Sequence, residues 1–283
     1  MKYLWIVLTA GGLMSGCGVE NKSDSLEQKV DKTVRAVMLN TNVNAPVAKK
    51  VPYEMSAHGV TRNDNYYWMR DDSRTDTEIL AHLEQENRYV DTVLAPLKET
   101  REALYEELVS RIEKDDSTVP VFDNGYWYYT RYSGENEYPV YLRKPSLDAE
   151  PQVLLDANVM SEGHDYFSIG SYAVSSNNML MAYSEDTLSR RIYTVYVKNL
   201  ESDEKLNDVL EGTSGRAVWA NDNEHLFYVK KDPQTLLGYQ VYRHKLGTSQ
   251  ESDVLVYEES NPTFYTYISK SKDDSVIYID HSN

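Results

Sequence analysis

The fold of this chain is decided by a strand, a polar turn and a return strand: Tyr126-Trp127-Tyr128-Tyr129-Thr130-Arg131, Ser133-Gly134-Glu135-Asn136 and Tyr138-Pro139-Val140-Tyr141-Leu142-Arg143. Aromatic and β-branched residues favour pleated, half-buried strands, and a short polar segment with glycine favours a hairpin turn. The whole sequence has the same bias, with 24 Tyr against 4 Phe. These features predict a mainly β fold.

The same strand–turn–strand unit recurs along the chain. Residues 180–183 can pair with 192–197, residues 226–229 with 240–243, and residues 276–279 begin a further unit. The equivalent strands are spaced by 54, 46 and 50 residues. A repeat of about 50 residues built from antiparallel strands is typical of a β-propeller, although a meander or a sandwich of similar strands is the alternative.

Short polar turns accompany the repeats, and we expect each to precede the inner strand of its blade: Ser175-Ser176-Asn177-Asn178, Asn221-Asp222-Asn223-Glu224 and Lys272-Asp273-Asp274. At about 50 residues per blade, residues 118–283 hold three blades and the start of a fourth. The predicted fold is therefore a partial β-propeller of about 3–4 blades.

A helical pattern comes before the strands, within a predicted segment of residues 46–117. Thr75 followed by Glu78 resembles a capping box, and the first helix then carries one apolar stripe. Pro96 ends that helix, and a second is expected from Leu97 to about Lys114. Two adjacent amphipathic helices predict a helical hairpin whose stripes pack in a core: Ile79, Leu80, Leu83, Val90 and Leu94, then Leu97, Leu104, Leu108 and Ile112.

Composition and charge argue against several classes of function. With 45 acidic and 29 basic side chains the net charge is −16, which opposes binding to nucleic acid. The six histidines are at least 19 residues apart and there is one cysteine, so we expect no metal site and no disulfide. An acidic protein could favour basic peptides, although a solvated acidic surface is the simpler interpretation.

The first residues have the pattern of a bacterial lipoprotein signal. A short apolar run from Tyr3 to about Met14 leads into Ser15-Gly16-Cys17, which resembles a lipobox. We expect residues 1–17 to be the signal with Cys17 as the lipidation site, and residues 18–45 to be a flexible tether. Gly18 after the cysteine favours the outer membrane, facing the periplasm. The alternative is an ordinary secretory signal with an incidental cysteine.

Residues 46–283 resemble the prolyl oligopeptidase family. The opening segment carries His58-Gly59, Arg62, Asp64 and then Tyr66-Tyr67-Trp68-Met69-Arg70-Asp71-Asp72, which is similar to the family's opening motif. Asn65 stands where the family usually has proline, and residues 187–191 depart from the usual glycine and glutamate. Later motifs, in chain order, look most like the oligopeptidase B branch: Glu86-Asn87-x-Tyr89, Tyr138-Pro139-Val140-Tyr141, Leu155-Asp156-x-Asn158, Val218-Trp219 and His244-x-Leu246-Gly247-Thr248.

The resemblance implies a serine-type peptidase that cleaves short peptides after Arg or Lys. Its seven-bladed propeller would act as a size filter, and the helical segment would pack on an α/β-hydrolase domain bearing a Ser-Asp-His triad. The sequence has no G-x-S-x-G elbow for that serine. Gly212-Thr213-Ser214-Gly215-Arg216 fails at its fifth position, and Gly170-Ser171 also fails.

We therefore expect no catalytic, cofactor-binding or metal-binding residue in this chain, and Cys17 is the one site residue it offers. The expected partners are short peptides, the absent hydrolase domain and, through the lipid, a membrane. The chain would be a fragment, from a truncated record or an interrupted gene. The alternatives are a lipid-anchored binding module without catalysis, or a non-functional remnant.

Overall fold

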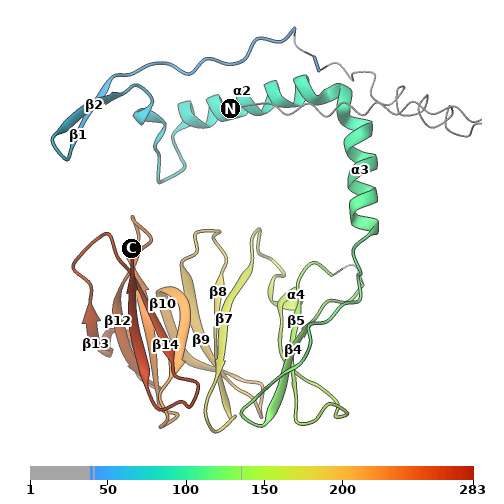
Figure 1. Ribbon diagram of the computed structural model, residues 1–283, viewed down its shortest axis with the longest axis vertical. Helices are drawn as coiled ribbons and strands as arrows, with labels where there is room; N and C mark the ends of the chain where they lie inside the picture. The colour runs from blue at the N-terminus through green and yellow to red at the C-terminus, as the bar shows by residue number, and fades with distance from the viewer. Residues whose placement is uncertain (1–38, 41, 135) are drawn as a thin grey trace, which may run out of the picture. The chain divides into compact units, whose positions relative to one another are not determined.

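The computed structural model describes residues 39, 40, 42–134 and 136–283 (Figure 1). The chain divides into two compact units, one ending at Arg111 and the other spanning Ile112–Asn283. The predicted boundary, between residues 117 and 118, falls six residues later. The predicted signal of residues 1–17 and most of the tether lie outside the described residues. Within the described part, no helix is both long enough and apolar enough to span a membrane.

The first unit opens with a β-hairpin inside the segment that was predicted to be helical. Strands β1 (Tyr53–Ala57) and β2 (Val60–Asp64) pair antiparallel. The turn between them is His58-Gly59, with φ values of 51° and 76°. Two consecutive residues at positive φ form the turn whose twist matches that of a hairpin. The predicted helical segment of residues 46–117 therefore also contains a β-hairpin, which the sequence analysis did not predict.

The loop before the first long helix is organised by the carboxylate of Asp71. It accepts hydrogen bonds from the backbone N–H groups of Ser73, Thr75 and Asp76, at 3.0, 2.7 and 2.8 Å. The bond from the Ser73 hydroxyl, together with these backbone donors, lowers the pKa of Asp71 to about 2. The guanidinium Nη2 of Arg70 lies 3.6 Å from Oδ2 of Asp72. The Arg70-Asp71-Asp72 segment is thus a loop built around the carboxylate of Asp71.

The first helix, α2 (Thr77–Leu94), begins two residues after the predicted Thr75. Its N-cap is Asp76, whose carboxylate accepts from the N–H groups of Glu78 and Ile79 at 2.8 and 3.2 Å. The backbone of Thr75 is instead bound to Asp71, so Thr75 is not the cap that the capping box requires.

Pro96 lies in a short 3₁₀ turn, η2 (Ala95–Leu97), from which α3 (Lys98–Ser110) continues. Figure 1 shows α2 and α3 meeting at a sharp bend, so the expected hairpin is two successive helices rather than an antiparallel pair. The second helix is shorter than predicted. Ser110 Oγ bonds Glu107 O, and Arg111 N–H closes the last turn on Leu108 O.

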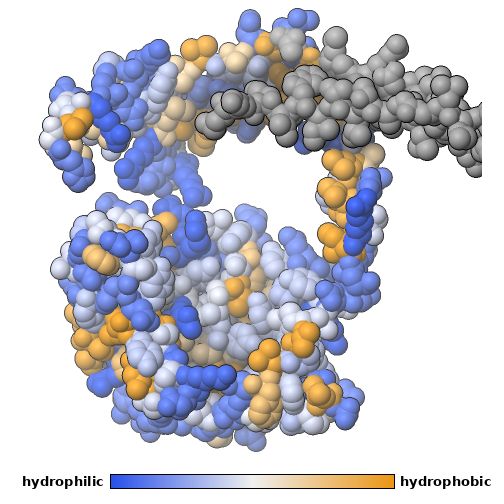
Figure 2. All heavy atoms as spheres, in the orientation of Figure 1, coloured by the Kyte–Doolittle hydropathy of each residue, from blue (hydrophilic) through white to orange (hydrophobic). Residues whose placement is uncertain are grey.

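The apolar stripes of these helices are largely exposed within the first unit. Ile79 is the one residue of α2 that is buried, while Leu104 and Leu108 on α3 are 53% and 55% exposed. Figure 2 shows the apolar side chains of α3 gathered along one side of the helix. The prediction that the stripes pack in a core is therefore wrong for α3 within its own unit.

The second unit consists of antiparallel sheets arranged as consecutive propeller blades (Figure 1). The first blade has four strands in sequence order, and the short helix α4 (Ala157–Met160) follows it. The return strand begins at Val140 because Pro139 lacks an N–H for the ladder, and the Pro139 carbonyl bonds Ala157 instead. The strands of this blade are β3 (Val121–Asp123), β4 (Tyr126–Arg131), β5 (Val140–Lys144) and β6 (Gln152–Asp156).

The next two blades share one sheet of seven strands in continuous order from β7 to β13. They share it because β10 pairs with β9 through its first half and with β11 through its second. The strands are β7 (Ser168–Val174), β8 (Leu180–Asp186), β9 (Tyr193–Asn199), β10 (Lys205–Trp219), β11 (His225–Lys231), β12 (Gly238–Lys245) and β13 (Val254–Glu258), with the 3₁₀ turn η3 (Gln250–Ser252) before the last.

A final pair, β14 (Tyr265–Lys270) and β15 (Ile277–Ser282), forms half of a fourth blade. The prediction of three blades and the start of a fourth is therefore confirmed. One detail was wrong: the polar turns at 175–178, 221–224 and 272–274 follow the inner strands β7, β10 and β14. They lead into the second strand of each blade, because the inner strand of a blade is the edge strand that precedes the turn.

The core lies between successive blades. One apolar cluster lies between the first two blades, a second packs the halves of the seven-stranded sheet, and a third joins β10–β12 to β14. They centre on Leu154 and Met181, on Leu210 and Leu226, and on Val229 and Ile268. Each blade therefore buries its faces against its neighbours, as the repeat predicts.

Candidate functional site: the channel-facing wall

A cavity of about 630 Å³ lies against the inner edge strands of the propeller unit. One side of the cavity is lined by residues 170–174 of β7 and 214–219 of β10. We call these two stretches the channel wall. The end of β3 and the turn after it contribute Asp123 and Asn124, and the end of β14 and the segment after it contribute residues 270–272 and Asp274. Inner strands line the central channel of a propeller, so this is the surface that anything passing through the channel would contact.

The wall has its shape because β10 bends where it leaves one blade and enters the next. Gly212 and Gly215 have φ values of 71° and 90°, and the strand register shifts around them. The ring of Tyr193 packs so closely against Gly215 that an added Cβ would lie 2.7 Å from it, and one on Gly170 would lie 2.6 Å from it. The Ser171 hydroxyl ties the two strands together by donating to Gly215 O at 2.6 Å.

This wall also contains the sequence that came nearest to a nucleophile elbow. An elbow needs a sharp turn between a strand and a helix, which exposes the serine hydroxyl. Residues 212–216 lie inside β10, and Ser171 lies inside β7 with its hydroxyl already bonded. Among the described residues that line the cavity there is no histidine to act as a base. The wall can hold or pass a polar chain, but it lacks a paired nucleophile and base.

The polar turns form a rim of hydrogen bonds from blade to blade. The turns that contain Asn124 and Asn178 are joined by two bonds across the first two blades: Asn124 Nδ2 donates to Ser176 O at 2.9 Å, and Asn178 Nδ2 donates to Asn124 O at 3.0 Å. Asn177 N–H donates to Asn223 Oδ1 at 3.0 Å, and Asn221 Nδ2 donates to Asp274 O at 2.8 Å. Turn side chains therefore set the spacing of the inner edges.

The sequence shows these turns at the spacing of the repeat but indicates no further role for them. Their Asn and Asp content was the available signal, because such side chains readily bond nearby backbone groups. The partner turns lie about 50 residues away in the sequence, so the pairing itself required the fold.

Both signs of charge occur around the cavity. Its lining includes the acids Asp123 and Asp274 and the bases Arg216, Lys270 and Lys272. Lys270 Nζ lies 2.7 Å from Asn221 Oδ1 and 3.2 Å from Asp274 Oδ1, so it is held at the rim. Burial raises the pKa of Tyr172, on the wall, to about 12, so its phenol stays neutral.

The buried tryptophan of the wall joins two strands. Trp219 is 2% exposed and its indole N–H donates to Ala173 O at 2.8 Å. Trp219 therefore packs in the interior and joins the two strands. Cys17, the one site residue predicted from the sequence, lies outside the described residues.

Consecutive four-stranded blades around a polar channel wall define a β-propeller domain. The chain belongs to the prolyl oligopeptidase family, because residues 46–283 match the family model described as "Prolyl oligopeptidase, N-terminal beta-propeller domain". The predicted family and the predicted partial propeller are both confirmed.

Individual relatives agree with this assignment. The chain is 45% identical over 249 residues to dipeptidyl aminopeptidase BI of Pseudoxanthomonas mexicana, covering 82% of this chain and 34% of the relative. It is 35% identical over 242 residues to Protease 2 of Moraxella lacunata, covering 83% and 35%.

Among solved structures, oligopeptidase B from Leishmania major matches with a TM-score of 0.78 and 31% identity, covering 84% of this chain and 36% of that one. Oligopeptidase B from Trypanosoma brucei, with covalently bound antipain, matches with a TM-score of 0.76 and 28% identity, and again covers 84% of this chain and 36% of that one. The chain thus spans about a third of the length of the relatives it matches.

Proposed function

We propose that this chain is the substrate-gating part of a serine-type oligopeptidase that acts on short peptides. The observation that carries the proposal is the polar cavity against the channel wall, in a chain that belongs to a family of peptidases. A channel bounded by packed blades admits an extended peptide and excludes a folded domain. The hydrolytic step would use a Ser-Asp-His triad on a domain outside these 283 residues.

We further propose that the preferred substrates carry Arg or Lys before the cleaved bond. The net charge of −16 attracts basic peptides to the chain as a whole. The resemblance of the sequence motifs to the oligopeptidase B branch implies the same preference.

An assay of the product of the complete reading frame tests the activity. Blocked chromogenic peptides ending in Arg or Lys should be hydrolysed, and a serine-directed inhibitor should stop the reaction. The purified 283-residue chain alone should show no turnover above buffer, because it lacks a G-x-S-x-G elbow. Turnover by the short chain that survives rigorous purification would contradict the view that the catalytic groups lie elsewhere.

A second candidate is removal of dipeptides from free N-termini. The relative named dipeptidyl aminopeptidase, at 45% identity, favours it. The same assay separates the two activities when each peptide is tested with a free and with a blocked N-terminus. Cleavage of both forms supports the oligopeptidase, whereas cleavage of the free form alone supports the aminopeptidase.

We also propose that the protein is exported and anchored through Cys17 to the periplasmic face of the outer membrane. The support is the short apolar run that ends in Ser15-Gly16-Cys17. Expressed in a bacterium with its own leader, the protein should incorporate labelled fatty acid and sediment with membranes. Cys17→Ser should remove the label. If the variant keeps both the label and the membrane association, the anchor is not at this cysteine.

A further inference from the structure

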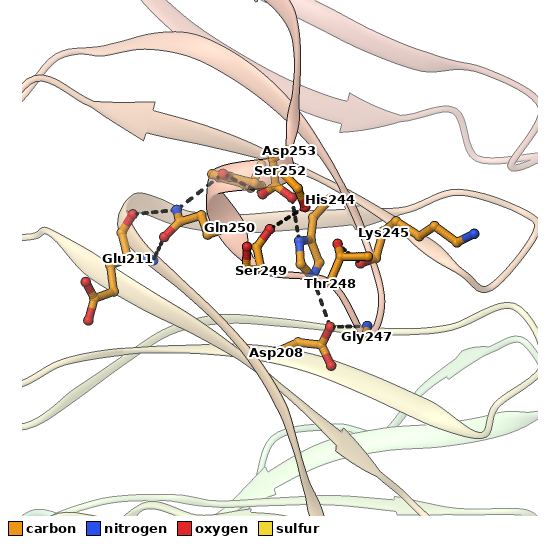
Figure 3. A network of polar contacts seen from close by, with 11 residues as sticks. Asp208, Glu211, His244, Lys245, Gly247, Thr248, Ser249, Gln250, Ser252 and Asp253 are labelled. Atoms are coloured by element: carbon orange, nitrogen blue, oxygen red, sulfur yellow. Dashed lines mark hydrogen bonds and ion pairs between the residues drawn. The ribbon is translucent and has the colours of Figure 1, made fainter.

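A buried histidine lies between two carboxylates in the propeller unit. The side chain of His244, on β12, is fully buried. Its Nδ1 is 2.7 Å from Asp253 Oδ1, and its Nε2 is 2.9 Å from Asp208 Oδ1 (Figure 3). Both carboxylate side chains are also buried, at 0% and 4% exposure. The motif that contains His244 has no part in the proposed peptidase function.

Each carboxylate accepts a second hydrogen bond from a group that can only donate there. Gly247 N–H donates to Asp208 Oδ1 at 2.6 Å, and the Tyr228 hydroxyl donates to Asp253 Oδ2 at 2.9 Å. Burial raises the pKa of Tyr228, and its bond to Asp253 raises it further, so this hydroxyl keeps its proton. Gln250 Nε2 completes the set by donating to the Tyr228 oxygen at 3.2 Å.

Two buried carboxyl groups face the two ring nitrogens, and a doubly protonated imidazole is the form that can donate to both. We therefore treat the arrangement, as part of the inference, as a cation between two anions. The groups that face the ring from the strands around it are Asp208 on β10, Asp253 before β13 and, through Asp253, Tyr228 on β11.

The two carboxylates come from different blades. Asp208 lies on the half of β10 that completes the second blade, whereas His244 and Asp253 belong to the third. Beyond Asp208 the same strand continues into residues 214–219 of the channel wall. We infer that His244 is a positioning residue, a charged clamp that fixes β10 between two blades and so holds the channel wall in place.

The inference goes beyond the proposed peptidase and can be tested without activity. In H244Q the two buried carboxylates lose their cation, and breaking a buried ion pair on one side is strongly destabilising. Hydrogen exchange followed by mass spectrometry should show peptides covering 205–211 and 243–253 exchanging at least about 30-fold faster. Peptides from the first blade, 140–156, should be unchanged. Exchange is read peptide by peptide, so self-association of the chain does not prevent the measurement.

A triple variant, D208N/H244Q/D253N, separates charge from packing. It has nearly the same side-chain volumes as H244Q but no buried charges, so the cost of an uncompensated buried charge is removed. Its exchange at 205–211 and 243–253 should return to within about tenfold of wild type. H225Q is the control, because His225 also pairs with an aspartate, Asp222 at 2.7 Å, but near the surface. It should leave exchange unchanged at both segments.

Three results would overturn the clamp: wild-type exchange in H244Q, equal acceleration in H244Q and the triple variant, or equal acceleration in every blade. Should H244Q fail to fold, the triple variant decides. A folded triple variant supports the clamp, and one that also fails to fold contradicts it.

Discussion

At the scale of single residues, the contacts between blades depend on polar side chains that bond backbone groups. Arg143 shows this. Its guanidinium is buried, lies 4.2 Å from the centre of the Tyr126 ring and donates to Gln152 Oε1 at 2.8 Å. It also donates at 3.3 Å to Asn178 O in the next blade. A buried cation kept in this way fixes the relative position of two blades more specifically than apolar contact could.

Glycine has a second role at this scale, because it lets two strands approach one aromatic ring. Replacing Gly215 by alanine adds a Cβ 2.7 Å from the Tyr193 ring at a φ of 90°. Gly125 is the matched control, with a φ of 86° and nothing within 4 Å of the added atom. Both variants are destabilised by the positive φ, but only Gly215→Ala also places an atom too close to its neighbours.

We expect Gly215→Ala to lose about 1–3 kcal/mol more unfolding free energy than Gly125→Ala. Denaturant unfolding of the product of the complete reading frame, monitored by fluorescence, would measure the difference. Equal losses in the two variants would show that Tyr193 gives way and that close approach does not require glycine at 215.

At the scale of single elements, the start of α2 shows how an exposed loop decides a helix boundary. Thr75 and Asp76 are both acceptable N-caps, and the sequence pattern with Glu78 favours Thr75. The carboxylate of Asp71 captures the backbone N–H groups of both residues, which leaves the side chain of Asp76 to cap the helix. A loop contact from four to five residues upstream therefore overrides the capping-box pattern.

Substitution distinguishes the two caps. Asp76→Ala should lower the free energy of unfolding of the first unit by about 1 kcal/mol, since it removes the hydrogen bonds from Glu78 N–H and Ile79 N–H. Thr75→Ala is the control and should cost much less, because the Thr75 hydroxyl bonds only the Ser73 hydroxyl, at 2.7 Å. Circular dichroism during urea unfolding would measure both. A larger loss in Thr75→Ala would restore the capping box that the sequence suggested.

Strands were easier to predict than helices, for a physical reason. The pairings of 180–183 with 192–197 and of 226–229 with 240–243 follow from local alternation and short connections, and both are present. The double role of β10 was not predictable, because its two halves pair with different neighbours and its bend at Gly212–Gly215 depends on Tyr193. Whether the apolar stripes of α2 and α3 are buried depends on tertiary packing, which the periodicity of the sequence does not specify.

At the scale of the whole molecule, the order of blades was predictable and the channel wall was not. A repeat of about 50 residues specifies blades, and blades specify an inner edge. Which side chains meet at that edge, such as Ser171 with Gly215 or Asn221 with Asp274, depends on the stacking of units far apart in sequence. Charge pairing at His244 likewise required the fold.

The two outermost faces of the described propeller unit are apolar and uncovered. At the first blade, Phe122 is 57% exposed. At the last pair of strands, Tyr265 and Tyr267 are 48% and 49% exposed, while the alternate residues Thr266 and Ile268 are buried. In a propeller these are the faces that neighbouring blades cover.

Such exposure sets the stability expected of residues 18–283 when they are purified alone. At about 25 cal/mol per Å², a few hundred Å² of uncovered apolar surface costs several kcal/mol. A typical domain is stable by only about 5–15 kcal/mol. The first blade also leaves β3 and β6 as unpaired strand edges, which can template association with another chain. We therefore expect this chain to be aggregation-prone or only partly folded.

Size-exclusion chromatography and thermal unfolding of residues 18–283 test this expectation. The expected result is an elution profile dominated by associated species and a broad or irreversible transition. A matched comparison adds Phe122→Lys and Tyr267→Lys, which place charge on the two uncovered faces without entering the clusters between blades; both should shift the profile towards monomer. A monodisperse wild-type monomer with one sharp, reversible transition would show that the described blades are stable without neighbours. That result would favour a lipid-anchored binding module over one part of a larger peptidase.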